Sequence, residues 1–244
     1  MPFPETGAAP YSQENSLSKL EYTVTEWPAT DVCAGMSRRT RKVYDNVAAV
    51  YPLSTMLFHS NAHRCALDMS GIEDGMRVLE VATGSGEMFR RIVRANRNGA
   101  TVGIDISPNM AARTQKRARL EFPASDAHCQ AVDARHMPFR DGSFDAVVCC
   151  YLLELLPAES IVQALAEIHR VLLRRGRLTL ILIGQNAAIF NEVYKVAGRI
   201  APAFWGRQVE QRIPELIEAR TFEILHDEKV KQIFYPSRVL VARK

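Results

Sequence analysis

The chain has 244 residues, of which 47% are hydrophobic and 24% are charged, and its formal net charge at pH 7 is +4. These are the values of an ordinary globular protein, so they exclude disordered, collagen-like and disulfide-scaffold classes. The excess of positive charge is too small to indicate a nucleic-acid partner by itself.

The cysteines and the hydrophobic runs indicate where the protein works. The five cysteines contain no Cys-x-x-Cys pair, which argues against a disulfide framework or a cysteine zinc site and favours a reducing, cytoplasmic location. No apolar run approaches the roughly 18 residues that a membrane span needs. The first residues lack a basic start followed by an apolar core, so we expect no signal peptide.

The first 70 residues divide into two segments. Residues 1–36 are rich in Pro, Ser, Thr and Glu and keep no hydrophobic period, so we predict an arm that is either flexible or folded over a site. In residues 37–70 the apolar spacing becomes helical, and we predict helices that begin a single domain spanning 37–244.

Short β-rich runs alternate with helical segments in residues 71–185. Ser107 and Pro108 open one of these helices with a capping side chain and a first-turn proline. The alternation predicts an α/β fold with a doubly wound, mostly parallel sheet and helices on both faces. The expected strands are 77–82, 101–106, 127–132, 144–150 and 177–183, and the expected helices are 87–95, one from Pro108 onward, and 158–173.

The rhythm of strands and helices breaks after Gly184. Residues 186–220 read as helical and rich in aromatic side chains, and we predict that they cover the site. Two closing strands are expected within residues 221–244, at 221–226 and 232–242, with the turn between them beginning at Asp227-Glu228. An antiparallel strand there gives a mixed sheet of seven strands.

A glycine-containing loop follows the first predicted strand and leads directly into a helix. Glycine lets the backbone turn tightly and lets a ligand approach closely, and the helix N-terminus offers unpaired N–H groups. The loop is neither a dinucleotide fingerprint, because Phe89 stands in place of the third glycine, nor a P-loop. An ordinary strand-to-helix turn is the alternative. The loop consists of Ala82, Thr83, Gly84, Ser85 and Gly86.

Acidic residues lie in or after three consecutive predicted strands. Asp105 ends the second strand, where an acid can accept hydrogen bonds from both hydroxyls of a ribose. Asp133 follows the third strand and can accept from an adenine amine, and Glu80 lies inside the first strand, where a charge is costly unless it is used or paired. Together they suit an adenosine with a cationic tail and would repel polyphosphate. The alternatives are turn or capping roles for the aspartates and a core arginine as partner of Glu80.

Five segments together resemble the class I S-adenosylmethionine-dependent methyltransferases in order and spacing. Within that class the sequence is most similar to the ubiquinone/menaquinone C-methyltransferase group, whose Tyr-Asp-x-x-Ala-x-x-Tyr-Asp motif resembles residues 44–51. The resemblance implies a Rossmann-like fold and S-adenosyl-L-methionine as cofactor, with S-adenosyl-L-homocysteine as product. The five segments are 78–86, 103–110, 133–139, 142–148 and 166–172.

The resemblance also implies roles for individual residues. Glu80 and the loop from Ala82 to Gly86 would hold the methionine part of the cofactor, and Asp105 would bind the ribose. The adenine would lie beside Ile106 and Met110, with its edge read by Asp133 and Ala134. Cys150 would line the floor near the sulfonium, and Tyr44 and Tyr51 would close over the cofactor.

The sequence departs from the family pattern at three places, of which the last bears on the acceptor. Pro52 replaces the second aspartate of the N-terminal motif, and residues 173–177 replace a Lys-Pro-Gly-Gly turn with what we expect to be a looser turn. Residues 149–154 replace a more polar segment at the place where an acceptor should bind. Cys149 and Cys150 point to opposite faces of a strand, so small buried hydrophobes are the favoured interpretation.

Tyr44, Tyr51, His59 and Glu154 are the candidate catalytic residues. His59 and His63 are four residues apart on one helix face, which is a metal-ligand spacing, but no acidic third ligand is near and we expect no metal. Surface histidines or an acceptor base are the other interpretations. Glu154 is either a base at the acceptor pocket or an acid at a helix start.

The sequence thus predicts in-line SN2 transfer of a methyl group to a small or lipid-like acceptor, with a quinone-type ring or a lipid head group favoured. The protein must hold acceptor and methyl about 3 Å apart and dry, and it needs a base only for a poor nucleophile. The rivals are an S-adenosylmethionine-binding protein without transfer activity and a nicotinamide-dependent oxidoreductase. Basic helix clusters are expected to be solvated or to contact an anionic membrane peripherally, and we expect no nucleic acid partner.

Overall fold

The computed structural model describes residues 60–184, 210–232 and 236–244, all of which belong to the unit Val32–Lys244. The predicted arm 1–36, most of the predicted helices in 37–70 and most of the predicted cover 186–220 therefore lie outside the described residues.

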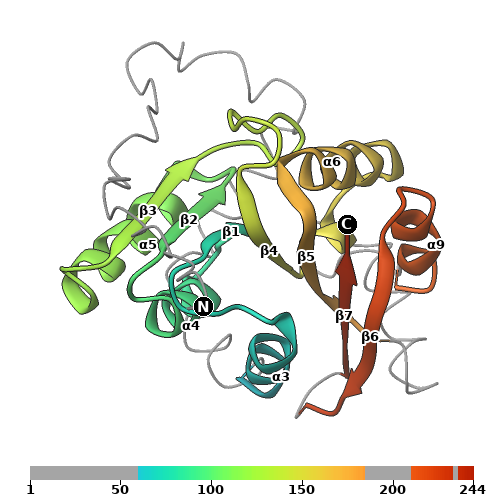
Figure 1. Ribbon diagram of the computed structural model, residues 1–244, viewed down its shortest axis with the longest axis horizontal. Coiled ribbons are helices and arrows are strands. Elements are labelled where there is room, and N and C mark those ends of the chain that lie inside the picture. The colour runs from blue at the N-terminus through green and yellow to red at the C-terminus, as the bar shows by residue number, and fades with distance from the viewer. Residues whose placement is uncertain (1–59, 185–209, 233–235) are drawn as a thin grey trace, which may run out of the picture. The chain divides into compact units, whose positions relative to one another are not determined.

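A seven-stranded sheet forms the centre of the described part (Figure 1). The strand order is β3-β2-β1-β4-β5-β7-β6, and β7 alone runs against its neighbours. This confirms the predicted mostly parallel sheet with an antiparallel strand at the C-terminal end. The strands are β1 (Arg77–Val81), β2 (Ala100–Asp105), β3 (Asp126–Ala131), β4 (Phe144–Cys150), β5 (Leu172–Ile183), β6 (Glu223–Val230) and β7 (Ser237–Arg243).

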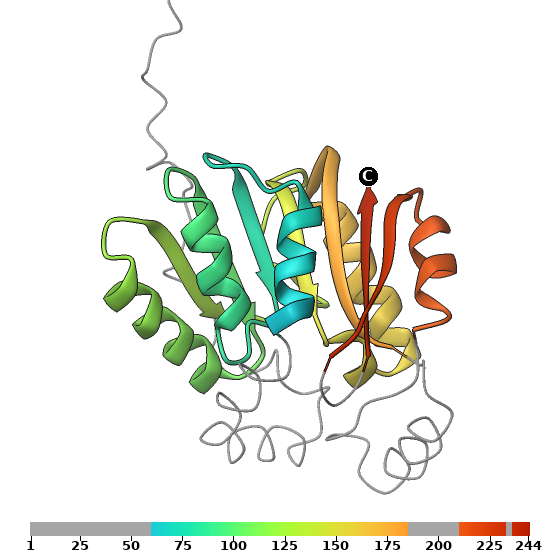
Figure 2. The same cartoon turned by 90° about the horizontal axis from the view of Figure 1, so that it is seen from below.

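Helices cover both faces of this sheet (Figure 2). On one face, α3 and α4 pack against side chains such as Val78 of β1 and Val148 of β4. On the other face, α6 and α9 pack against Leu79 and neighbouring apolar side chains. Each buried aliphatic side chain stabilises the fold by roughly 1.5–3 kcal/mol. The helices are α3 (Ser60–Ser70), α4 (Glu87–Ala95), α5 (Pro108–Glu121), α6 (Ala158–Val171) and α9 (Ile213–Glu218), with the short 3-10 helix η2 (Leu153–Leu155).

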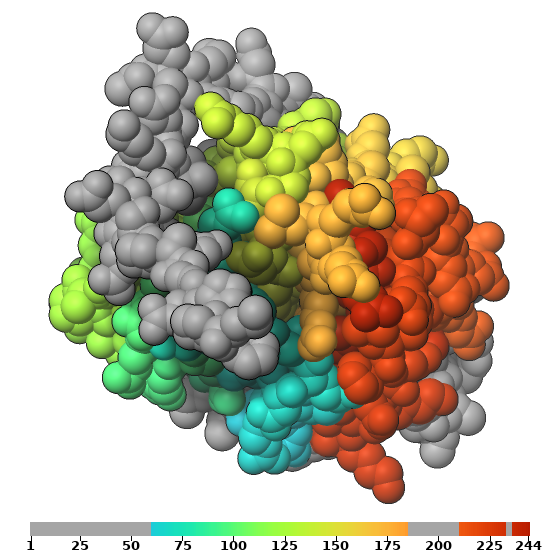
Figure 3. Space-filling view, in the orientation of Figure 1, coloured from blue at the N-terminus to red at the C-terminus, as the bar shows by residue number. Residues whose placement is uncertain are grey.

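The order of the strands fixes where a ligand can bind. The chain winds outward from β1 to β2 and β3 in one direction and then returns to β4 and β5 on the other side of β1. In open sheets of this kind, ligands bind beyond the carboxyl ends of the strands at the point where the order reverses. That point lies between β1 and β4. Helix α3 packs beside β5, β6 and β7, at the other end of the sheet from β3 (Figures 1 and 3).

Two local predictions were wrong. The expected turn at Asp227-Glu228 lies inside β6, where these residues pair with Leu240 and Val239 of β7. Because β6 is the edge strand and its residues 226–229 are all exposed, charged side chains are tolerated there.

The expected turn at residues 173–177 is instead an irregularity early in β5. Phe144 pairs with Leu172 and Ala146 pairs with Arg177, so the intervening residues bulge, and Arg175 adopts a φ of 67°. Helix α6 accordingly ends at Val171 and not at Leu173.

The arginines of α4 are paired within the fold, and one arginine of α5 binds a backbone carbonyl. The guanidinium groups of Arg90 and Arg94 both bind the carboxylate of Glu121, which joins the two helices. Arg91 pairs with Glu87 at 3.4 Å, and Arg117 donates to the carbonyl of Ser85 at 3.0 Å. These four arginines therefore act within the fold.

Candidate cofactor and acceptor site

The loop between β1 and α4 turns through three residues with positive φ. These are Ala82 at 63°, Gly84 at 49° and Gly86 at 77°. A Cβ at Gly86 would lie 2.7 Å from Oγ1 of Thr114, whereas a Cβ at Gly84 would meet no atom of the described residues within 4 Å. The loop is therefore closed against α5 at Gly86 and open at Gly84, as a loop that admits a ligand must be.

Asp105 at the end of β2 fixes this loop. Its Oδ2 accepts the N–H of Gly84 at 2.8 Å, and its Oδ1 accepts the N–H of Ser107 at 2.9 Å. Burial raises the pKa of Asp105 although both hydrogen bonds favour the charged form. Each carboxylate oxygen can accept a further hydrogen bond, so the predicted contact with a ribose is compatible with this geometry.

Glu80 is a buried carboxyl with an unsatisfied oxygen. Its residue is 1% exposed, and Oε2 has no hydrogen-bond partner within residues 60–184, 210–232 and 236–244. Burial, followed by the charge of Asp105, raises the pKa of Glu80 well above its ordinary value. The alternative of a core arginine partner is wrong for the described residues. An uncompensated acid here fits a cationic ligand group, because such a group would supply the missing partner.

Asp133 lies beyond the end of β3 and already has a partner. Its carboxylate accepts from Nε and Nη2 of Arg135 at 3.0 and 2.5 Å, and from the backbone N–H of Arg135 at 2.9 Å. Burial raises the pKa of Asp133, but the hydrogen bonds from Arg135 outweigh it and the pKa is lowered. If Asp133 binds the edge of an adenine, its carboxylate must therefore accept hydrogen bonds from the adenine and from Arg135 at the same time.

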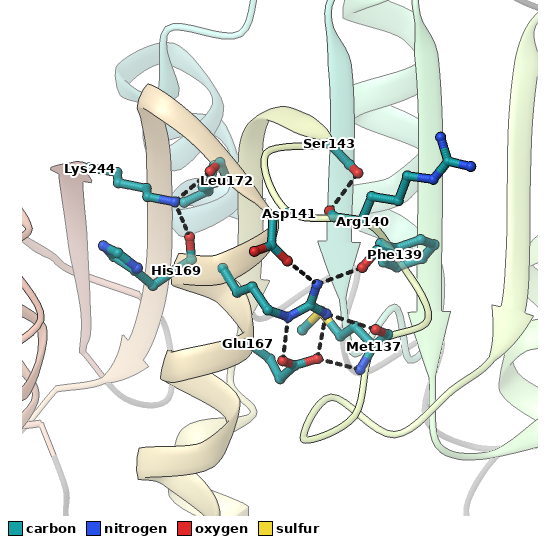
Figure 4. Close-up of polar contacts among 10 residues, drawn as sticks. Met137, Phe139, Arg140, Asp141, Ser143, Glu167, His169, Leu172 and Lys244 are labelled. Carbon is teal, nitrogen blue, oxygen red and sulfur yellow. Dashed lines mark hydrogen bonds and ion pairs between the residues drawn. The ribbon is translucent and has the colours of Figure 1, made fainter.

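Arg170 of α6 holds the segment that follows Asp133 (Figure 4). Its guanidinium donates to the carbonyls of Met137 and Phe139 at 2.9 and 2.6 Å, and to both oxygens of Glu167 at 2.7 and 2.8 Å. Glu167 in turn accepts the N–H of Met137 at 2.6 Å. The sequence pattern gives no sign of these roles for Glu167 and Arg170, although both lie in segment 166–172.

Ile106 and Met110 follow β2 as predicted. Ser107 caps α5, since its Oγ accepts the N–H of Met110 at 3.4 Å, and Met110 is buried while Ile106 is half-buried. Ala134 is half-buried beside Asp133. These residues and the glycine loop gather at the carboxyl ends of β1, β2 and β3.

The cysteines of β4 are packed, unreactive groups. Cys149 belongs to the apolar cluster under α6, and Cys150 packs into the cluster under α3 and α4, so their side chains do point to opposite faces. Burial raises the pKa of both thiols, and the carboxyl groups nearby raise it further. Cys150 lies on the same sheet face as Val148, which pairs with Glu80.

Tyr151 follows β4 with a φ of 54°, a strained conformation for a residue with a side chain. Its hydroxyl lies 2.8 Å from Oγ of Ser237 and accepts from Nε2 of Gln232 at 3.2 Å. His63 of α3 lies beside its ring, with the two centroids 6.3 Å apart. His63 is 3% exposed, so the interpretation as a surface histidine was wrong.

Glu154 lies in η2, just beyond the carboxyl end of β4, and is 1% exposed. Its Oε1 accepts the N–H of Ile183 at the end of β5 at 2.6 Å, and its Oε2 has no hydrogen-bond partner in the described part of the chain. Burial raises the pKa of Glu154 to about 7. The other three catalytic candidates, Tyr44, Tyr51 and His59, lie outside the described residues.

Three further observations limit the site. In the described ranges, no group of three or more histidine, cysteine or acidic residues could hold a metal ion. None of the described helices is long and apolar enough to cross a membrane. A groove of about 590 Å³ between α5 and β3 contains none of the predicted site residues.

Several known proteins are similar to this chain in sequence or in structure. A methyltransferase domain model matches residues 78–176. A 2-phytyl-1,4-naphtoquinone methyltransferase of Nostoc sp. is 28% identical over 142 residues, which cover 56% of this chain and 61% of that protein. A ubiquinone/menaquinone biosynthesis C-methyltransferase of Hahella chejuensis is 30% identical over 176 residues, covering 70% of each chain. The solved structure of the [4+2]-cyclase SpnF superposes with a TM-score of 0.67 at 19% identity, covering 84% of this chain and 96% of that one.

The fold and the site define a class I S-adenosylmethionine-dependent methyltransferase, and its cofactor is S-adenosyl-L-methionine. Within that class, the chain belongs to the family of the ubiquinone/menaquinone C-methyltransferases. The alternative of a nicotinamide-dependent oxidoreductase is thereby wrong. The alignments span from 61% to 70% of the length of the two relatives described, so the acceptor does not follow from them.

Proposed function

We propose that the protein transfers the methyl group of S-adenosylmethionine to a ring carbon of a reduced, lipid-like quinone. The observation that carries the proposal is the buried, unsatisfied carboxyl of Glu80 beside an open glycine loop, in a chain of this family. The names of two relatives supply the acceptor class, because one acts on a phytylnaphthoquinone and the other in ubiquinone and menaquinone biosynthesis.

The residues present fit the cofactor. Glu80 has a free oxygen for a cationic group, and Asp105 retains acceptor capacity for hydroxyls. The space over Gly84 is open, so backbone and ligand can approach closely there. When bound, S-adenosylmethionine supplies a sulfonium whose methyl group is already activated for transfer.

The work left to the protein is positioning. We assign Glu80 and residues 82–86 to the methionine part, Asp105 to the ribose, and Ile106, Met110 and Ala134 to the adenine. Asp133 shares its carboxylate between Arg135 and the adenine edge, and Cys150 contributes an apolar floor. Tyr44 and Tyr51 are proposed to close the site. Holding the acceptor carbon in line with the methyl group, in a dry site, lowers the barrier by removing orientational freedom.

Cofactor binding is tested by calorimetry with S-adenosylhomocysteine on the full chain. We expect micromolar binding that is lost in Asp105→Ala and weakened at least roughly 10-fold in Glu80→Gln, since a charge-assisted contact contributes about 1.5–3 kcal/mol. Glu159→Gln is the matched control, because Glu159 is exposed on α6. No binding by the wild-type chain, or unchanged binding in Asp105→Ala, refutes the cofactor assignment.

Transfer itself is tested by a homocysteine-release assay with two acceptors. One is a 2-prenyl-1,4-naphthoquinol kept reduced, and the other is phosphatidylethanolamine in vesicles. We expect turnover with the quinol only. Turnover with the lipid amine alone would move the acceptor class to lipid head groups, and binding without turnover on either would favour a protein that binds the cofactor without transferring a methyl group.

A reaction other than methyl transfer has a structural precedent on this fold. SpnF shares this fold and is named a cyclase, which shows that the fold alone does not fix the reaction. A lipid-like acceptor also implies peripheral contact with a membrane. Co-sedimentation with anionic vesicles at low and high salt tests that contact, because electrostatic binding weakens as salt screens the charges.

A further inference from the structure

The carboxyl ends of β4 and β5 carry a second unsatisfied acid, separate from the acids of the cofactor loop. Glu154 follows β4 by four residues, and its Oε1 accepts the N–H of Ile183, the last residue of β5. The side chain is thus fixed between the two strand ends. Its Oε2 is buried and lacks a hydrogen-bond partner in the described part of the protein.

The neighbourhood of Glu154 disfavours its charge. Residue Glu210, which precedes α9, adds a negative charge near it, and Cys149, Cys150 and Tyr151 are the other titratable groups close enough to interact with it. Glu210 is itself paired with Arg238 at 3.5 Å. The described residues give Glu154 no cation as a partner. Ionisation of this buried carboxyl therefore destabilises the fold, which suggests that the carboxylate has a role in the reaction.

The other buried groups at this edge are less suited to take a proton. The thiols of Cys149 and Cys150 have a raised pKa, so they remain protonated and accept poorly. The hydroxyl of Tyr151 is engaged by Ser237 and Gln232, and burial raises its pKa too. Among the described residues, Glu154 combines a fixed position, a vacant acceptor oxygen and a place beside the strand end that bears Cys150, and the other unsatisfied acid, Glu80, is already assigned to the cofactor.

We propose that Glu154 is the general base that removes the proton from a ring hydroxyl of the acceptor. This inference rests on the proposed function, and it narrows the acceptor to an aromatic ring with a free hydroxyl. A neutral hydroquinol is a weak carbon nucleophile, whereas its phenolate directs an electron pair to the neighbouring ring carbon.

The step balances without a further reactant. Glu154 takes the hydroxyl proton, the freed electron pair moves into the ring, and the ring carbon forms a bond to the methyl group as the methyl–sulfur bond breaks. The sulfur keeps that electron pair. The methylated ring carbon then loses its hydrogen as a proton to water, the ring becomes aromatic again, and Glu154 returns its proton to the oxygen. One proton is released in total.

The experiment compares wild type, Glu154→Gln and the exposed control Glu159→Gln with two reduced acceptors. These are a 2-prenyl-1,4-naphthoquinol and a fluorinated analogue whose hydroxyl is more acidic. We expect kcat of Glu154→Gln to fall roughly 100-fold with the first acceptor, as for loss of a general base, and much less with the second, which ionises without help. The Kd for S-adenosylhomocysteine should stay within about twofold.

The pH dependence gives an independent readout. For the wild type, kcat should rise with pH through about 7, since the carboxylate is the active form, and this rise should be absent in Glu154→Gln. Glu154→Asp, which keeps the carboxyl but shortens its reach, should recover part of the activity and the pH-dependent rise.

Each outcome decides between the claims. An unchanged kcat in Glu154→Gln, or an equal loss with both acceptors, overturns the role of Glu154 and leaves the proposed function standing. A loss of S-adenosylhomocysteine binding together with kcat shows that Glu154 acts on the fold and also overturns its role as base. If the wild type binds S-adenosylhomocysteine but methylates neither quinol, the proposed function itself fails.

Discussion

Glu154 should make the folded protein less stable as the pH rises, and replacing it with glutamine should remove that loss. The folded-state pKa of Glu154 is about 7, whereas the ordinary value is 4.5. A group whose pKa is raised on folding contributes stability that is fully present below pH 4.5 and is lost as the pH rises through 7. Above pH 7 the loss from this one carboxyl amounts to about 3 kcal/mol.

Glutamine keeps the acceptor for the N–H of Ile183 but cannot ionise. The free energy of unfolding of Glu154→Gln should therefore exceed that of the wild type by about 1 kcal/mol at pH 5 and by about 3 kcal/mol at pH 8. With a urea m-value of about 2–3 kcal/mol per molar for a domain of this size, the midpoint at pH 8 should rise by about 1 M. All other titrating groups are shared, so most of their effects cancel in the difference.

Urea unfolding followed by far-UV circular dichroism at pH 5, 6, 7 and 8 measures this difference directly. The control Glu159→Gln should track the wild type at every pH, because Glu159 is exposed. Two parallel curves for wild type and Glu154→Gln, or a gap that narrows toward high pH, would refute the reasoning. In that case the pKa of Glu154 is the same in the folded and the unfolded protein.

The glycine loop and Arg170 yield three more predictions. Gly86→Ala should lower the free energy of unfolding by about 2–3 kcal/mol and Gly84→Ala by about 1 kcal/mol, because only the change at Gly86 adds a clash with Thr114 to the strain of a positive φ. In calorimetry, however, Gly84→Ala should weaken S-adenosylhomocysteine binding more than Gly86→Ala does. Ala82→Gly should raise the thermal midpoint by relieving about 1 kcal/mol of strain at φ 63°, and a lower midpoint would contradict this. Arg170→Met should cost about 2 kcal/mol in urea unfolding and raise the KM for S-adenosylmethionine, since the segment beyond Asp133 loses its anchor; an unchanged KM would mean that the anchor serves the fold alone.

The elements that could be predicted from the sequence are those with local signals at both ends. The bounds of β4 and α4 match the prediction, because a dense apolar run and a glycine-bounded helix start leave little freedom. Ser107 caps α5 as expected, since a capping side chain acts on N–H groups two or three residues away.

The elements that could not be predicted depend on distant partners. Asp227 and Glu228 read as a turn, yet they pair with residues of β7 that stabilise them in an edge strand, and Arg238 holds Asp227 at 2.7 Å. The early part of β5 likewise forms because Arg175 donates its N–H to Lys244, nearly 70 residues away. Local composition contains no trace of either contact.

The candidate site shows the same division among its acids. The strand pattern alone predicts that Glu80, Asp105 and Asp133 lie at one edge of the sheet, because parallel strands end together. The sequence did not reveal which of them has a cationic partner. Arg135 stands only two residues from Asp133, but whether it turns back onto the carboxylate is decided by the loop that Arg170 and Glu167 hold.

This distinction separates acids that already have a cationic partner from acids that have none in the described residues. The pKa of Asp133 and of Glu167 is lowered by arginines, so these carboxylates are charged and already paired within the fold. The pKa of Glu80, Asp105 and Glu154 is raised by burial, and no arginine or lysine pairs with any of them in the described residues. Three such groups destabilise the fold without a ligand, and a cationic cofactor on Glu80 or a proton from an acceptor on Glu154 would supply what each lacks. S-adenosylmethionine should therefore raise the thermal unfolding midpoint of the wild type more than that of the Glu80→Gln variant. Equal stabilisation of both proteins would show that the unpaired carboxyl of Glu80 is not what binds the cofactor.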